Sequence, residues 1–243
     1  MWCDIGMLYF ITFVGSLVAG IIQTVTGFGS GIFLMMIMPA FFDLVQAPSL
    51  VGSITVILGV YISFIYRKRI IWRLVLPPII FYMVGTIIAI MLIPLLNLEL
   101  LSFCFGIFLV LLAVFMSYSE NNRISTSKFL STVLCTAGGF FSGLFSSGGP
   151  LTAIYFLNAT DSHDEYIANG QFLFMTTSII TFLLRITKGF YTMDLLPYTG
   201  IGIFGIVSGT YLGIKITGKL NGTKIKKIIY MCVVLCGIVT LLQ

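Results

Sequence analysis

The sequence predicts an all-α integral membrane protein of about ten helical segments. Hydrophobic residues make up 58% of the 243 residues, and charged residues make up only 9%. The mean hydropathy is +1.10. A soluble domain carries roughly 25% charged residues on its surface. The gaps between apolar runs are too short to form a soluble domain, so we expect one membrane domain over residues 1–243.

Charge-free apolar runs define the expected segments, because a helix needs about 20 apolar residues to cross the hydrocarbon core. We expect the first run to be retained as a helix, since Met1 to Asp4 lacks the basic region of a signal peptide. The predicted segments are 5–26, 28–42, 46–66, 74–95, 98–118, 129–146, 149–160, 166–184, 195–214 and 225–242.

Two of these segments are too short for a full crossing, at 15 residues for 28–42 and 12 residues for 149–160. Each begins at a glycine-rich junction, Gly27-Phe28-Gly29-Ser30-Gly31 in one case and Ser147-Gly148-Gly149-Pro150 in the other. The sequence therefore predicts a helix break at both places.

The two junctions occupy corresponding places in the chain, which indicates an internal repeat. Residues 1–120 form the expected first copy, and residues 121–243 form the second. The matching positions are Gly15 and Gly20 with Gly138 and Gly143, Pro77 with Pro197, and Gly85-Thr86 with Gly209-Thr210.

The distribution of Lys and Arg favours a topology, because cytoplasmic loops collect these residues. With ten segments, eleven of the 13 basic residues fall on one face, and only Arg185 and Lys188 fall on the other. If each glycine junction is instead a kink within one continuous span, the chain has eight spans, and eight basic residues fall on one face and five on the other. We therefore expect a multi-pass protein of the cell membrane with both termini outside.

Five segments in each copy place the second copy upside down relative to the first, as in many secondary transporters. Charge counting does not separate two full crossings at each junction from a re-entrant hairpin, since both leave the flanking loops on the same sides.

The glycine-rich junctions are the leading candidates for a binding site. A broken helix exposes main-chain N–H groups and a positive dipole end inside the membrane, which suits an anion. The alternative is that the glycines only permit close helix packing, as we expect for Gly205, Gly209 and Gly213. Packing alone does not require truncated segments, so we favour a site. Nearby uncharged donors are Gln23, Thr24, Thr26, Ser142, Ser146, Ser147 and Thr152.

Three further polar residues are secondary candidates. Arg185 follows an apolar run and either holds an anion or extends to the lipid headgroups. Asn169 and Gln171 lie near the start of a segment, where polar side chains line either a helix interface or a pathway.

Other function classes find little support. We expect no enzyme, because the sequence contains no P-loop, nucleophile elbow or paired zinc ligands. The basic residues are scattered, which argues against nucleic-acid binding. Four of the five cysteines lie in apolar runs. His163 lies in a polar run that we interpret as a solvated loop, the alternative being that its carboxylates and histidine hold a cation weakly. We therefore expect no metal site and no cofactor.

The run from Gly143 to Leu151 (GLFSSGGPL), followed by Ala153 to Leu157, resembles the second-half signature of the TauE/SafE sulfite exporter family. Gly27 to Gly31 with Pro39 is similar to the first-half signature, although it reads GFGSG where many members have GxGGG. The resemblance implies an exporter of small sulfur-containing anions, driven by an ion gradient. It does not select the anion.

The leading hypothesis is therefore a secondary transporter that exports sulfite or organosulfonates, coupled to protons or sodium ions. The alternative is an uncoupled channel or facilitator for a small organic acid. The expected partners are the sulfur oxyanion, the coupling ion and the lipid bilayer, and a homo-oligomer stays open. The substrate-binding candidates are Gln23, Thr26, Gly27, Phe28, Gly29, Ser146, Ser147, Gly148, Gly149, Pro150, Asn169, Gln171 and Arg185.

Overall fold

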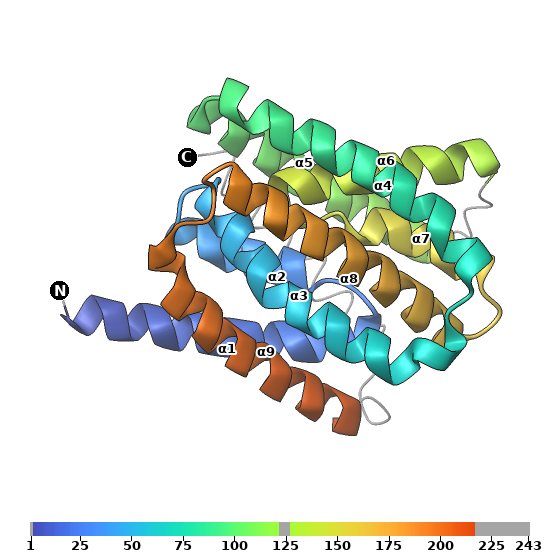
Figure 1. Ribbon diagram of the computed structural model, residues 1–243, viewed down its shortest axis with the longest axis horizontal. Helices are drawn as coiled ribbons and strands as arrows, with labels where there is room; N and C mark the ends of the chain where they lie inside the picture. The colour runs from blue at the N-terminus through green and yellow to red at the C-terminus, as the bar shows by residue number, and fades with distance from the viewer. Residues whose placement is uncertain (1, 122–126, 217–243) are drawn as a thin grey trace.

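The computed structural model describes residues 2–121 and 127–216, which fold into a bundle of helices (Figure 1). Within these ranges there is no β-strand, so the all-α prediction is confirmed. Short 3₁₀ turns occupy Met38–Ala40, Arg67–Arg69, Ile93–Leu95 and Met193–Leu195. The helices are α1 (Trp2–Thr26), α2 (Ser30–Ile37), α3 (Gln46–Tyr66), α4 (Trp72–Leu92), α5 (Leu98–Asn121), α6 (Lys128–Phe145), α7 (Gly149–Ala159), α8 (His163–Thr187) and α9 (Leu196–Ile216).

Six helices in the described part of the chain are long and apolar enough to cross a membrane, namely α1, α3, α4, α6, α8 and α9. Their outer surfaces carry large exposed apolar side chains, such as Ile80 and Met91 on α4 and Phe204 on α9. Exposing apolar surface to water costs roughly 25 cal/mol per Å², whereas lipid accepts it. The molecule is therefore a multi-pass membrane protein.

Two pairs of helices pack in parallel at close range. On α1 and α9, a Cβ atom added to Gly205 would lie 2.5 Å from the Phe13 carbonyl oxygen, and one added to Gly213 would lie 2.8 Å from Thr24 Cβ. On α4 and α6, a Cβ added to Gly143 would lie 2.8 Å from the Thr86 carbonyl oxygen. Only glycine permits these approaches, as predicted for the Gly205 series.

Helices α3 and α8 pack antiparallel to each other. Arg185 near the end of α8 donates to Ser49 near the start of α3, at 3.0 Å. Further along α3, a Cβ on Gly59 would lie 3.2 Å from Met175 Cα. This pair connects the first half of the chain to the second.

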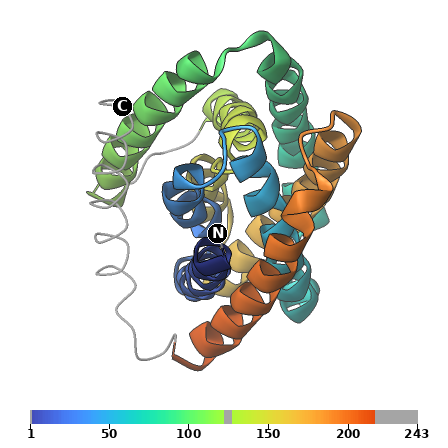
Figure 2. The ribbon, with the colours of Figure 1, turned by 90° about the vertical axis from the view of Figure 1, so that its left-hand side faces the viewer.

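Helices α2 and α7 are short and fold back on the helices before them. A Cβ on Gly15 of α1 would contact Ile37 of α2 at 3.6 Å, and a Cβ on Gly138 of α6 would lie 3.0 Å from Thr152 of α7. In the end-on view of Figure 2, α1, α2 and α6 lie between α5 and α9. Each predicted helix break is therefore the turn of a helical hairpin.

The predicted segments agree closely with the helices. Segment 46–66 coincides with α3, and segment 149–160 is α7 with one further residue. Segment 28–42 becomes α2 plus a 3₁₀ turn, because Pro39 interrupts the α-helical hydrogen bonding. The tenth segment, 225–242, lies outside the described residues, so the ten-segment count and the inverted repeat stay predictions.

The polar run around His163 is not simply a loop. Asp161 and Ser162 precede α8, and His163 is its first residue. Ser162 Oγ accepts from Glu165 N at 3.3 Å, and Glu165 Oε2 accepts from Asp161 N at 3.2 Å. These residues therefore cap the start of α8. In the described part of the chain, no group of three or more His, Cys, Asp or Glu side chains is placed to hold a metal ion.

Candidate functional site

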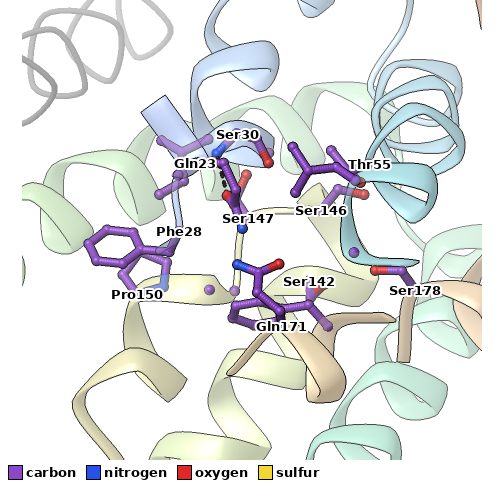
Figure 3. A pocket seen from close by; sticks show the side chains of 18 of the residues that line it. Gln23, Phe28, Ser30, Thr55, Ser142, Ser146, Ser147, Pro150, Gln171 and Ser178 are labelled. Atoms are coloured by element: carbon purple, nitrogen blue, oxygen red, sulfur yellow. Dashed lines mark hydrogen bonds between the residues drawn. The ribbon is translucent and has the colours of Figure 1, made fainter. Parts of the chain in front are cut away.

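The turns of the two helical hairpins touch each other. We call residues 26–31 the first tip and residues 145–149 the second tip. A Cβ atom on Gly31 would overlap the Ser146 carbonyl oxygen, so the main chains are in direct contact. Beside this contact lies a cavity of about 60 Å³ (Figure 3). Because one water needs roughly 10–15 Å³ of such space, the cavity takes about four to six water-sized groups.

The first tip depends on glycine. Gly27 has φ 81° and Gly29 has φ 105°, which are backbone conformations that residues with a Cβ rarely adopt. Gly29 is the N-cap of α2, and its carbonyl accepts from Phe33 N at 2.9 Å. Gln23 on the last turn of α1 reaches across the break, and its Oε1 accepts from Ser30 N at 3.0 Å. The break thus positions the first turn of α2 against the cavity.

The second tip uses hydroxyl groups and one left-handed residue. Ser146 has φ 52°, which ends α6, and its Oγ donates to the Pro48 carbonyl at 2.8 Å. Ser147 Oγ donates to the Phe145 carbonyl at 2.8 Å. A Cβ on Gly148 would overlap the Gly138 carbonyl oxygen, so α7 starts in contact with the α6 main chain. Pro150 occupies the first turn of α7, where no N–H partner is needed.

Gln171 of α8 ties the first tip to the second half of the chain. Its Nε2 donates to the Gly27 carbonyl at 2.9 Å. The same carbonyl accepts from Gln23 Nε2 at 3.4 Å. Gln171 is only 1% exposed and lines the cavity between the tips. Two neutral amides therefore stabilise the carbonyl that the helix break leaves without a helical donor.

Helices α3, α4 and α8 form the remaining walls. Apart from Gln171, the residues that they contribute were not predicted from the sequence, because each lies in an otherwise ordinary apolar helix. Spacings of three, four and seven residues were the available signal, since such residues share one helix face. The residues are Thr55, Leu58 and Gly59 of α3, Tyr82 of α4, and Phe174 and Ser178 of α8.

None of the described residues that line this cavity carries a formal charge. The helices α2 and α7 begin here, and the first N–H groups of a helix have no acceptor within it. Each helix start corresponds to roughly +0.5 elementary charge. Main-chain dipoles and neutral donors therefore make the cavity suited to a small anion.

Nine of the thirteen predicted binding residues line the cavity, and the structure thus brings both glycine-rich junctions together. Thr26 and Gly27 belong to the first tip but do not line the cavity, and Thr26 Oγ1 donates to the Ile22 carbonyl at 2.9 Å. The nine are Gln23, Phe28, Gly29, Ser146, Ser147, Gly148, Gly149, Pro150 and Gln171.

Asn169 and Arg185 lie away from the cavity lining. Asn169 Oδ1 accepts from Ile71 N at 2.8 Å, and its Nδ2 donates to the Glu165 carbonyl at 2.8 Å. It therefore joins the start of α4 to α8.

Arg185 is buried at 1% exposure inside α8 and does not extend to headgroups. Its guanidinium donates to the carbonyls of Gly143 and Leu144, the latter at 3.2 Å, and to Ser49 Oγ. It therefore caps the last turn of α6, whose carbonyls have no helical donors, beside the second tip.

The fold and the cavity together define a multi-pass membrane protein whose broken helices meet at a buried, uncharged polar site. A family model described as sulfite exporter TauE/SafE matches residues 12–240. The chain belongs to this transporter family. Comparison with curated proteins and comparison with solved structures each gave no match.

Proposed function

We propose that this protein is a secondary transporter that exports small sulfur-containing anions, such as sulfite or organosulfonates, across the cell membrane. The observation that carries the proposal is the meeting of two helix starts at a buried cavity without charged side chains. Membership of the sulfite exporter family supports the substrate class.

The absence of charge from the cavity lining fits a transporter. An anion held by arginine in a buried site is strongly stabilised, and release then becomes slow. Main-chain N–H groups replace the water of the anion with weaker, neutral hydrogen bonds. The anion can therefore enter and leave.

The two halves of the chain are proposed to be inverted five-segment repeats. In this arrangement α1 corresponds to α6 and α4 corresponds to α9. The parallel pair α1 with α9 then corresponds to the parallel pair α6 with α4, which supports the proposal. The hairpins α1–α2 and α6–α7 are likewise equivalent, and α3 pairs with its own counterpart, α8. We propose that Arg69 faces the cytoplasm and that Leu98 and both termini face outward.

Labelling of single cysteines in intact cells tests this orientation. On a background without native cysteines, a cysteine at position 98 should react with an impermeant reagent, and one at position 69 should not. A cysteine at position 224, outside the described residues, should behave like position 69. Labelling of positions 69 and 224 from opposite faces contradicts the inverted arrangement.

Binding is tested with detergent-purified protein. Sulfite, thiosulfate, taurine, sulfoacetate and sulfate are compared by the rise in apparent melting temperature, because a ligand of the folded state stabilises it. We expect a rise with sulfite or a sulfonate. If none of these anions stabilises the protein, the proposed substrate class is wrong.

Gly149→Val tests the site itself. A Cβ at Gly149 would contact the Phe174 ring at 3.5 Å and Phe28 Cβ at 3.6 Å, so the larger valine side chain meets two residues that line the cavity. We expect folded protein with at least tenfold weaker anion binding. Gly200→Val is the matched control, because nothing lies within 4 Å of a Cβ at Gly200. Unchanged affinity in Gly149→Val would indicate that this glycine only packs helices.

Flux measurements in liposomes test the coupling. Export should collapse when the proton or sodium gradient is dissipated while ATP is held constant. Flux that simply follows the anion gradient would instead support an uncoupled channel or facilitator.

A further inference from the structure

We propose that the cavity selects a singly charged oxyanion that carries its own N–H or O–H donor, and that this donor binds Oε1 of Gln171. The inference rests on the proposed function, because it names the form of the anion at the same site. It favours hydrogen sulfite over sulfite, and amino- or hydroxyl-bearing anions over sulfate.

The first observation is an acceptor without a donor. Gln171 Oε1 is fully buried and has no hydrogen-bond partner among the described residues. Its side chain lines the cavity, and Figure 3 shows its amide next to Ser142 and below Ser147. A buried polar atom without a partner costs about 1–3 kcal/mol. A ligand that supplies a donor at this point recovers that free energy.

The orientation of the amide is determined by the Gly27 carbonyl. This oxygen accepts from Gln171 Nε2 at 2.9 Å and from Gln23 Nε2 at 3.4 Å. Rotating the Gln171 amide by half a turn would place Oε1 against the Gly27 oxygen, and two acceptors repel. Oε1 therefore stays on the side away from Gly27.

Three hydroxyl groups of the cavity lining already use their protons. Ser147 Oγ donates to the Phe145 carbonyl, Ser146 Oγ to the Pro48 carbonyl, and Thr55 Oγ1 to the Val51 carbonyl. These hydroxyls still accept from a ligand but do not donate to Gln171. No described donor of any kind lies within hydrogen-bond distance of Gln171 Oε1, so the donor must come from the bound molecule.

The charge of the cavity points to a monoanion. Two helix starts supply roughly one positive elementary charge in total. The nearest buried cation on α8, Arg185, is engaged with Ser49 Oγ and the α6 carbonyls. A dianion would retain about one negative charge without compensation, which is costly in a buried site. Adding a proton to the oxyanion reduces its charge and creates the missing donor at once.

Sulfamate and methanesulfonate provide a matched pair of probes. Both are singly charged and nearly identical in shape, but sulfamate has an NH₂ group where methanesulfonate has a methyl group. Titration of the purified protein with each anion should show that sulfamate binds about tenfold or more tightly. Gln171→Met should abolish this preference, and Thr176→Val on the same helix, outside the cavity lining, should retain it.

The outcomes separate the inference from the proposed function. Equal binding of both probes to the wild-type protein overturns the donor requirement and leaves the anion site standing. A sulfamate preference that survives in Gln171→Met overturns the assignment to this side chain. If Gln171→Met does not fold, the wild-type ratio decides alone. Failure of both probes and of sulfite to bind contradicts the proposed function itself.

Discussion

The first and second tips present a helix start to the same cavity but use different chemistry. The first tip needs two glycines with positive φ, Gly27 and Gly29. Two neutral side-chain amides donate to the Gly27 carbonyl, which has no helical donor. The second tip has one left-handed serine, Ser146, and a buried arginine caps the helix before it. The two helix starts are therefore held by different interactions, and the two tips should differ in what breaks them.

Helix α8 serves both tips. Gln171 contacts the first tip, and Arg185 contacts the end of α6 at the second. The two residues are 14 positions apart, which is roughly 21 Å along a helix. A rigid α8 therefore holds the two breaks in register, one with a neutral amide and the other with a cation.

The largest expected effect is on the second tip. Arg185→Met leaves the Gly143 and Leu144 carbonyls without donors and removes the bond to Ser49. We expect a loss of about 3–5 kcal/mol in stability, seen as a lower apparent melting temperature in detergent. Lys188→Met, at an exposed position three residues on, is the control. If both variants melt like the wild type, the capping role is wrong.

A somewhat smaller loss of stability is expected for alanine at Gly148, in contrast to the adjacent Gly149. Gly148→Ala forces a methyl group onto the Gly138 carbonyl, so α6 and α7 must move apart. We expect about 3 kcal/mol of destabilisation. Gly149→Ala meets its neighbours at ordinary contact distances, the nearest being Phe174 at 3.5 Å. It should melt within about 0.5 kcal/mol of wild type. Equal melting temperatures for the two variants would contradict the close approach of α6 and α7.

The smallest effect tests the first tip. Gly29→Ala places a Cβ on a residue with φ 105°, while its nearest neighbour, Ile22, lies at 3.3 Å. Because the cost is mainly conformational, we expect about 1–2 kcal/mol. The contrast with Gly149→Ala is informative, since both glycines line the cavity. Should the two alanine variants prove equally stable, the tips do not differ in their dependence on left-handed glycine.

The sequence by itself determined the protein class, most helix boundaries and the two breaks. Apolar runs and glycine-rich junctions are local signals, and the lipid bilayer requires each spanning segment to satisfy its own hydrogen bonds. For this reason 46–66 was predicted to the residue as α3, and α7 within one residue. The family signature also lies in the chain at Gly143 to Leu151, and a family model confirms the membership.

Only the tertiary structure decided which polar side chains face the cavity. Asn169 and Gln171 stand two residues apart on α8, and both are buried. Two positions correspond to about 200° around a helix, so one joins the start of α4 and the other lines the cavity. Both residues carry an amide side chain, so the residue type does not indicate which one faces the cavity. The direction in which each side chain points is determined by contacts with Ile71, before α4, and with Gly27. These residues lie 98 and 144 positions away along the chain.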